Sequence, residues 1–220
     1  MKNIVLFYKH YPMSVGVFFK EGFKQLGHNV LSVGAFSPTL PWTTRDVSKY
    51  VDHPDLETVE GMPLTVQSVV DRALRDKNFR ADLVVQVDAG HRLSGKASVP
   101  NVVIATDPHA FPSTYYAETF KDADLQYCMQ DAYMHEFQAI GIPVRWLPYA
   151  FSPTKHFWNP LARKDHFVTL ITGLMYPMRE ASRLKIAQEG MSYFMESGYL
   201  FDEGTEIYNR GTVALNWSSL

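Results

Sequence analysis

The feature that most constrains the fold of this chain is a series of short apolar runs, each followed by polar or acidic residues. These runs occupy residues 4–8, 82–87, 101–105 and 125–129. Largely apolar runs of this length are typical of strands that are buried on both faces of a parallel sheet. Segments with helical periodicity separate them, so residues 1–150 are predicted to form an open, largely parallel, Rossmann-like α/β domain.

The first repeat of this alternation can be followed residue by residue. Apolar residues recur at helical spacing from Phe19 to Leu26, and Gly27 is well placed to end that helix. A strand is predicted over 29–33, which completes a right-handed βαβ unit. Residues 35–62 contain several prolines and lack clear periodicity, so they are predicted to form a long loop with short helical pieces.

A second α/β region follows a break in the pattern. Residues 151–165 contain two prolines and mixed charge without periodicity, so they predict a linker. The alternation restarts at 166 and continues to 220, which is short compared with the ~100–150 residues of a typical domain. We therefore expect residues 166–220 to form an incomplete second domain, which a partner chain or a homo-oligomer could complete.

Composition narrows the class of function. The chain has 21 Lys and Arg residues against 23 Asp and Glu, a formal net charge of −2, so nothing indicates a nucleic-acid partner or attraction to anionic membranes. A single cysteine, Cys128, excludes an internal disulfide and fits a reducing cytoplasm. No apolar stretch approaches the ~18 residues needed to cross a bilayer. We expect a cytoplasmic protein without a membrane span.

Two acid–histidine pairs follow neighbouring predicted strands. Asp88 and His91 follow the strand at 82–87, and Asp107 and His109 follow the next one. Carboxyl ends of parallel strands share one edge of the sheet, and a carboxylate-oriented imidazole can act as a general base towards a hydroxyl group. The four groups could instead bind a metal. The alternative is that the acids cap helices or fix turns and the histidines bond to backbone carbonyls.

A glycine turn in the second region is a candidate phosphate site. Gly173 follows the predicted strand at 167–172, and Arg179 lies in the first turn of a helix that starts near Pro177. Free N–H groups and the dipole at a helix N-terminus favour an anion, and an arginine can pair with a diphosphate oxygen. The chain lacks the GxGxxG and P-loop motifs, and the alternative is a tight turn with a surface arginine.

Polar residues near the end of the chain form a third candidate group. Tyr208 and Asn209 lie in a short predicted helix, and Asn216 and Ser218 follow the last predicted strand. These side chains could face the same ligand as Arg179. The alternative is ordinary sheet packing followed by an exposed tail.

Five segments resemble a known family in their serial order. They are "ADLVVQVDAG", "VVIATDPHAF", "DADLQYCMQDAYMHEFQAIGIPVRWLPYAFSP", "HFVTLITGLMYPMRE" and "EIYNRGTVALNWS". This order is similar to that of the CgeB-like, spore-maturation-type glycosyltransferases, a family of the GT-B class. The resemblance spans roughly residues 80–220 and is most specific over 122–153.

The resemblance implies a GT-B-like fold of two Rossmann-like, open parallel-sheet domains, the second incomplete. It implies that the first domain binds a hydroxyl acceptor and the second a nucleotide-diphosphate sugar as co-substrate, without a metal or other cofactor. The acid–histidine pairs would serve acceptor binding or base catalysis. At matching positions, Gly173 and Arg179 would lie near the donor phosphates, and Asn216 and Ser218 just before the donor site.

The family pattern continues past the last motif with a helix whose glutamate binds the donor ribose, so we expect that half of the donor pocket to lie outside these 220 residues. Three functions fit the sequence: a glycosyltransferase that is inactive alone if its donor site is incomplete, a non-catalytic scaffold that binds a nucleotide, a glycan or a protein, and a metal-dependent hydrolase. Donor turnover separates the first from the second, and metal content identifies the third.

Overall fold

The structure is a computed structural model of the chain. It describes residues 1–88, 93–108, 113–150, 152–162, 164–165, 167–171 and 177–215. The chain divides into two compact units: the first comprises Met1–Pro38 and Val51–Ala150, and the second Thr39–Tyr50 and Phe151–Leu220. Both units contain parallel sheets and helices, so the predicted α/β class with open parallel sheets is confirmed.

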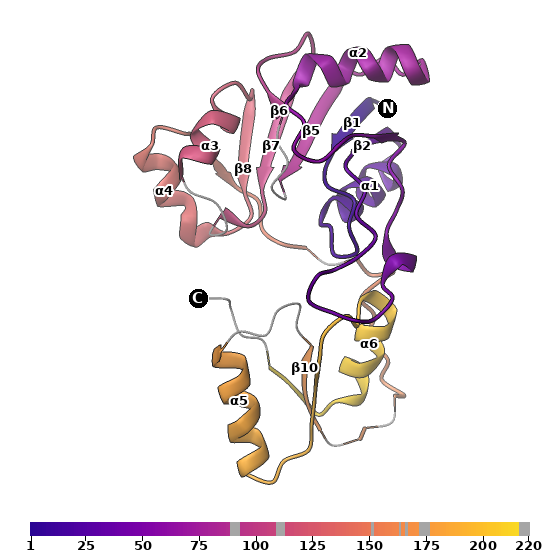
Figure 1. Ribbon diagram of the computed structural model, residues 1–220, viewed down its shortest axis with the longest axis vertical. Helices are drawn as coiled ribbons and strands as arrows, with labels where there is room; N and C mark the ends of the chain where they lie inside the picture. The colour runs from indigo at the N-terminus through magenta and orange to yellow at the C-terminus, as the bar shows by residue number, and fades with distance from the viewer. Residues whose placement is uncertain are drawn as a thin grey trace. The chain divides into compact units, whose positions relative to one another are not determined.

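The first unit is built on a seven-stranded sheet in the order β3-β2-β1-β5-β7-β8-β9 (Figure 1). Neighbouring strands pair in parallel throughout. The strands are β1 (Asn3–Phe7), β2 (Asn29–Gly34), β3 (Leu56–Glu57), β5 (Leu83–Asp88), β7 (Asn101–Ala105), β8 (Leu125–Cys128) and β9 (Arg145–Trp146). A separate parallel pair joins β4 (Leu64–Thr65) to β6 (Leu93–Ser94).

Helices cover both faces of the large sheet because successive strand residues point to opposite sides. Val5 and Phe7 of β1 pack towards α2 (Val66–Lys77), whereas Ile4 and Leu6 pack in a cluster with residues of α1 (Gly16–Gln25). The helices α3 (Ser113–Phe120) and α4 (Met134–Ala139) pack against alternate residues of β7 and β8. Burial on both faces explains why these strands are largely apolar in sequence.

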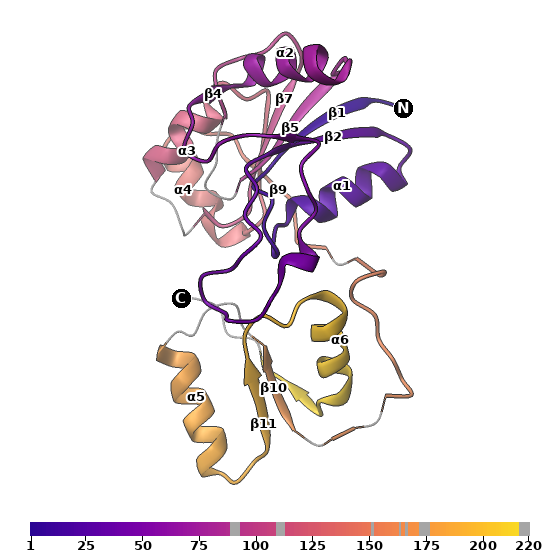
Figure 2. The same ribbon diagram turned by 45° about the vertical axis from the view of Figure 1, so that its right-hand side comes forward.

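The second unit contains a three-stranded parallel sheet in the order β11-β10-β12. Its strands are β10 (Val168–Ile171), β11 (Tyr193–Glu196) and β12 (Val213–Ala214). The connecting helices α5 (Pro177–Gln188) and α6 (Phe201–Arg210) flank this sheet on opposite sides (Figure 2). Among the described residues, 152–162 form neither helix nor strand, but Asn209 of α6 fastens them through hydrogen bonds of 2.9 Å with the backbone of Phe157 and Asn159.

A segment from the first half of the chain belongs to the second unit. The guanidinium of Arg45 lies 3.8 Å from the ring centroid of Tyr199 and donates to Glu203, and Lys49 pairs with the same carboxylate. A Cβ atom at Gly198, whose φ is +83°, would lie 2.5 Å from Thr43 Oγ1. Residues 39–50 therefore pack against the rest of this unit through specific contacts, although the sequence predicts an irregular loop there.

Candidate functional site

The topology of the first sheet indicates the edge at which a ligand would bind. The chain passes from β1 outwards to β2 and β3, and from β5 outwards in the other direction to β7, β8 and β9. The strand order therefore reverses between β1 and β5. In open α/β sheets, ligands bind outside the carboxyl ends of the strands near such a switch point. The residues that follow β1, β5, β7 and β8 are the first to consider.

Both predicted acids lie at this edge. Asp88 is the last residue of β5 and is paired in register with Ala105, the last residue of β7. Asp107 lies two residues beyond that strand. The predicted partners His91 and His109 lie outside the described residues, so the proposed acid–histidine pairing remains a prediction.

The Asp107 loop is held by donors from three separate elements. Tyr149, which follows β9, donates its hydroxyl to the Thr106 carbonyl at 2.6 Å, and Gln130 Nε2, which follows β8, donates to the same carbonyl at 3.2 Å. Tyr116 of α3 donates to the Asp107 carbonyl at 3.4 Å. The Thr106 hydroxyl contacts the Asp107 carboxylate at 3.3 Å. A half-buried carboxylate is therefore presented by a fixed backbone, as a general base or a ligand-orienting group requires.

Gln130 and Tyr149 were not among the residues chosen from the sequence. Gln130 directly follows a predicted strand, which places it at the carboxyl edge, but an amide there carries no specific signal. Tyr149 lies between a proline and the predicted linker, and its contact with Thr106 joins residues 43 positions apart. Only the assembled sheet brings these two side chains to the Asp107 loop.

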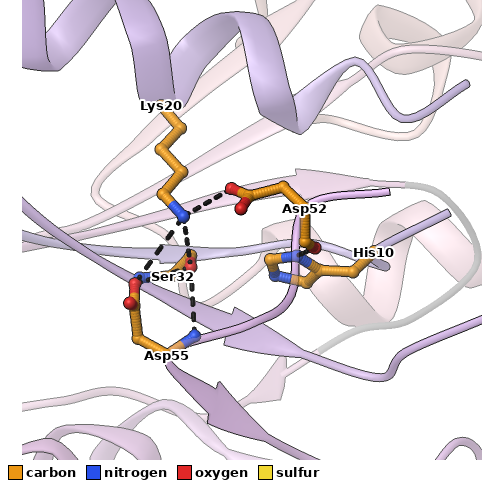
Figure 3. Close-up of polar contacts among 5 residues, drawn as sticks. All are labelled: His10, Lys20, Ser32, Asp52 and Asp55. Carbon is orange, nitrogen blue, oxygen red and sulfur yellow. Dashed lines mark hydrogen bonds and ion pairs between the residues drawn. The ribbon is translucent and has the colours of Figure 1, made fainter. Parts of the chain in front are cut away.

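A second polar cluster lies between α1 and the sheet, and Figure 3 shows it. Lys20 of α1 is buried, and its ammonium donates to Ser32 Oγ at 3.0 Å and to Asp52 Oδ2 at 2.5 Å. Its Nζ lies 3.8 Å from Asp55 Oδ2, which accepts the Ser32 hydroxyl and backbone N–H at 2.7 Å each. Burial raises the pKa of Asp55, but the bonds from Ser32 outweigh burial and leave this pKa below its usual value. These bonds fasten Asp55 to β2 and Asp52 to α1.

His10 completes this cluster at the end of β1. Its Nδ1 lies 2.7 Å from the Asp52 carbonyl, and because a carbonyl only accepts, Nδ1 carries the proton and Nε2 is an unprotonated acceptor. The ring stacks on Tyr8 with centroids 3.9 Å apart and is only 1% exposed. Burial lowers the pKa of His10 to about 4. A neutral imidazole enclosed in this way serves as an anchor. The sequence does not indicate this role, because one histidine after a strand forms no pattern.

The residues predicted for the donor site are mostly beyond what the structure describes. Gly173, Asn216 and Ser218 lie outside the described residues. Arg179 lies in the first turn of α5, which follows β10, whereas Tyr208 lies in the last turn of α6, which leads towards the start of β12. Because the two residues occupy opposite ends of their helices relative to the parallel strands, the structure does not bring Arg179 and Tyr208 together.

The described residues contain neither a metal-binding cluster nor a transmembrane helix. Within the described ranges, no group of three or more His, Cys, Asp or Glu side chains is arranged to hold a metal ion. His91 and His109 are outside those ranges, so this finding does not test the metal alternative. Of the helices that the structure describes, none combines the length and the apolar character that a transmembrane segment needs.

Comparison with known proteins leaves the family open. The sequence matches no protein-family model, and no curated protein is significantly similar to it. The functional assignment therefore depends on the residues and contacts described above.

Proposed function

We propose that this chain is a glycosyltransferase of the GT-B class, which moves a sugar from a nucleotide-diphosphate sugar to a hydroxyl acceptor. The observation that carries the proposal is the Asp107 carboxylate at the carboxyl edge of a doubly wound sheet, on a backbone whose Thr106 and Asp107 carbonyls accept hydrogen bonds from three elements. The serial order of motifs, similar to that of CgeB-like transferases, supports the same class. The presence of a second parallel α/β unit also agrees with it.

The chemistry is an attack by the acceptor oxygen on the anomeric carbon of the donor sugar. The new carbon–oxygen bond forms as the bond to the diphosphate breaks, and the nucleoside diphosphate leaves with the electron pair. A base among Asp88, His91, Asp107 and His109 takes the acceptor proton. Arg179 and the free N–H groups at the start of α5 stabilise the negative charge on the leaving diphosphate.

The test is a titration of the purified chain with UDP, GDP, dTDP and CDP sugars, followed by calorimetry and by measurement of released nucleotide. We expect Asp107→Asn to lower nucleotide release on addition of acceptor by about 100-fold, the usual size of a general-base contribution. Asp71→Asn is the matched control, because Asp71 is an exposed carboxylate on α2 that also accepts a side-chain hydrogen bond. Equal activity of both variants would reject Asp107 as the base.

The same titration separates this function from its alternatives. Donor binding without nucleotide release, with every acceptor tried, would favour a non-catalytic scaffold. A stoichiometric metal in the purified chain, together with hydrolysis that a chelator abolishes, would favour a metal-dependent hydrolase. No binding of any donor would contradict the transferase proposal for these 220 residues.

A further inference from the structure

Tyr149 spans the carboxyl edge of the first sheet. It follows β9, the outermost strand, whose pairing with β8 continues through the bond from Leu147 N–H to the Cys128 carbonyl at 2.9 Å. Its hydroxyl reaches Thr106, which follows β7, and lies 3.4 Å from Gln130 Nε2, which follows β8. The side chain therefore crosses the end of β8 and is anchored beside the Asp107 loop.

The anchored ring is also accessible. Tyr149 is 52% exposed even though its hydroxyl is bonded. Burial raises the pKa of this hydroxyl, so it remains protonated and continues to donate to Thr106. Because the hydroxyl is engaged by Thr106 and Gln130, the part of this side chain that remains to contact a ligand is the ring. A rigid aromatic face at a ligand-binding edge loses little conformational entropy when a ligand stacks on it.

The charge around the ring restricts what can stack there. Asp107 lies in the loop that Tyr149 contacts, and its charge contributes to the raised pKa of Tyr149. A carboxylate here disfavours an anionic ligand such as a sugar phosphate. An aromatic face is electron-rich and attracts polarised C–H groups, whereas hydroxyl groups at the rim of a ligand can donate to carboxylates.

We infer that Tyr149 is the stacking platform of the acceptor site and that the acceptor is a neutral carbohydrate ring. One apolar face of the sugar lies on the tyrosine ring, and a hydroxyl at its rim faces the Asp107 carboxylate. This inference rests on the proposed function for the role of the sugar as acceptor. The binding of the sugar to Tyr149 can be measured without any donor.

The experiment is saturation-transfer difference NMR on the full chain without nucleotide sugar. The probes are the methyl glycosides of glucose, galactose, mannose and N-acetylglucosamine, with sorbitol as an open-chain polyol that lacks the ring. We expect at least one glycoside, but not sorbitol, to receive saturation at its ring C–H protons. Tyr149→Leu should weaken this signal by about three- to ten-fold, the size of an aromatic stacking contribution. Tyr149→Phe keeps the ring and should stay within about two-fold of the unmodified chain.

Tyr193→Leu is the control, because Tyr193 belongs to the second unit, is 37% exposed and is also anchored through its hydroxyl, by Arg183 at 2.8 Å. The glycoside signal measured with Tyr193→Leu should equal that of the unmodified chain. The inference is overturned if no glycoside is saturated, if Tyr149→Leu binds as the unmodified chain does, or if tetramethylammonium binds at Tyr149 in place of the sugars. Sugar binding that needs Tyr149, without donor turnover, would support this site while rejecting the transferase.

Discussion

The enclosed imidazole of His10 makes a quantitative prediction about stability and pH. Burial lowers its pKa from 6.5 to about 4, so the folded chain holds His10 neutral where an unfolded chain would protonate it. Between these two values the unfolded state binds more protons, and stability therefore rises with pH. The contribution is fully present above pH 6.5 and is lost as the pH falls towards 4. A difference of 2.5 pKa units corresponds to about 3 kcal/mol of unfolding free energy.

The charged neighbours of His10 do not reverse this sign. The ammonium of Lys20 lowers the pKa of the imidazole, and the carboxylates of Asp52 and Asp55 raise it, but burial is the largest effect. Because the ring is 1% exposed, solvent screens these interactions little. At pH 4.5 we expect the first unit to have lost about 2 kcal/mol relative to pH 7 through His10 alone.

The assay is amide hydrogen exchange of peptides that cover β1, because these amides report opening of the first unit without the second. The comparison is with His10→Gln, which keeps a donor for the Asp52 carbonyl but does not titrate. Between pH 7 and 4.5 the original chain should lose about 2 kcal/mol more opening free energy than this variant. Equal losses in the two proteins would refute the reasoning, since they would mean that His10 is not held neutral by burial.

Two further predictions concern α1. Lys20→Met should lower the unfolding free energy of the first unit by about 2 kcal/mol in urea titrations, because it removes the ammonium that donates to Asp52 and Ser32. Adding Asp52→Asn should recover part of the loss, and additive losses would contradict the pairing. Gly16→Ala should lower the unfolding free energy by about 1–3 kcal/mol, because its Cβ would lie 2.2 Å from the Tyr8 ring. The Cβ of Gly22→Ala would meet nothing within 4 Å, so this variant should stabilise α1 by about 0.5–1 kcal/mol. Equal changes in melting temperature for the two variants would contradict this packing.

The parallel core could be predicted because burial on both faces leaves a clear mark in the sequence. The run predicted at 29–33 is β2, Asn29–Gly34, and the run at 125–129 contains β8, Leu125–Cys128. The predicted alternation also places Asp88 and Asp107 after neighbouring strands. These features depend on local periodicity, which a single sequence records directly.

The remaining features depend on contacts between distant residues. Residues 39–50 join the second unit through the ion pair of Arg45 with Glu203, which lie 158 positions apart. Sequence periodicity does not predict a pairing between such distant residues. Lys20 is buried, although a lysine in a helix ordinarily indicates an exposed position. Its carboxylate partners come from the proline-containing stretch at 35–62, so the sequence offered no reason to connect them.

The contacts of Asp107 also determine how its role can be tested. The carboxylate itself is contacted by the Thr106 hydroxyl, whereas Tyr149 and Gln130 hold the adjoining Thr106 carbonyl. A change at Asp107 therefore alters the chemistry of the site and leaves the bonds that hold its backbone in place. A change at Tyr149 removes a holding bond and leaves the carboxylate in place. If Asp107→Asn abolishes turnover while hydrogen exchange of β7 stays unchanged, Asp107 acts on the substrate; if exchange rises with the loss of turnover, its contribution is to hold the loop.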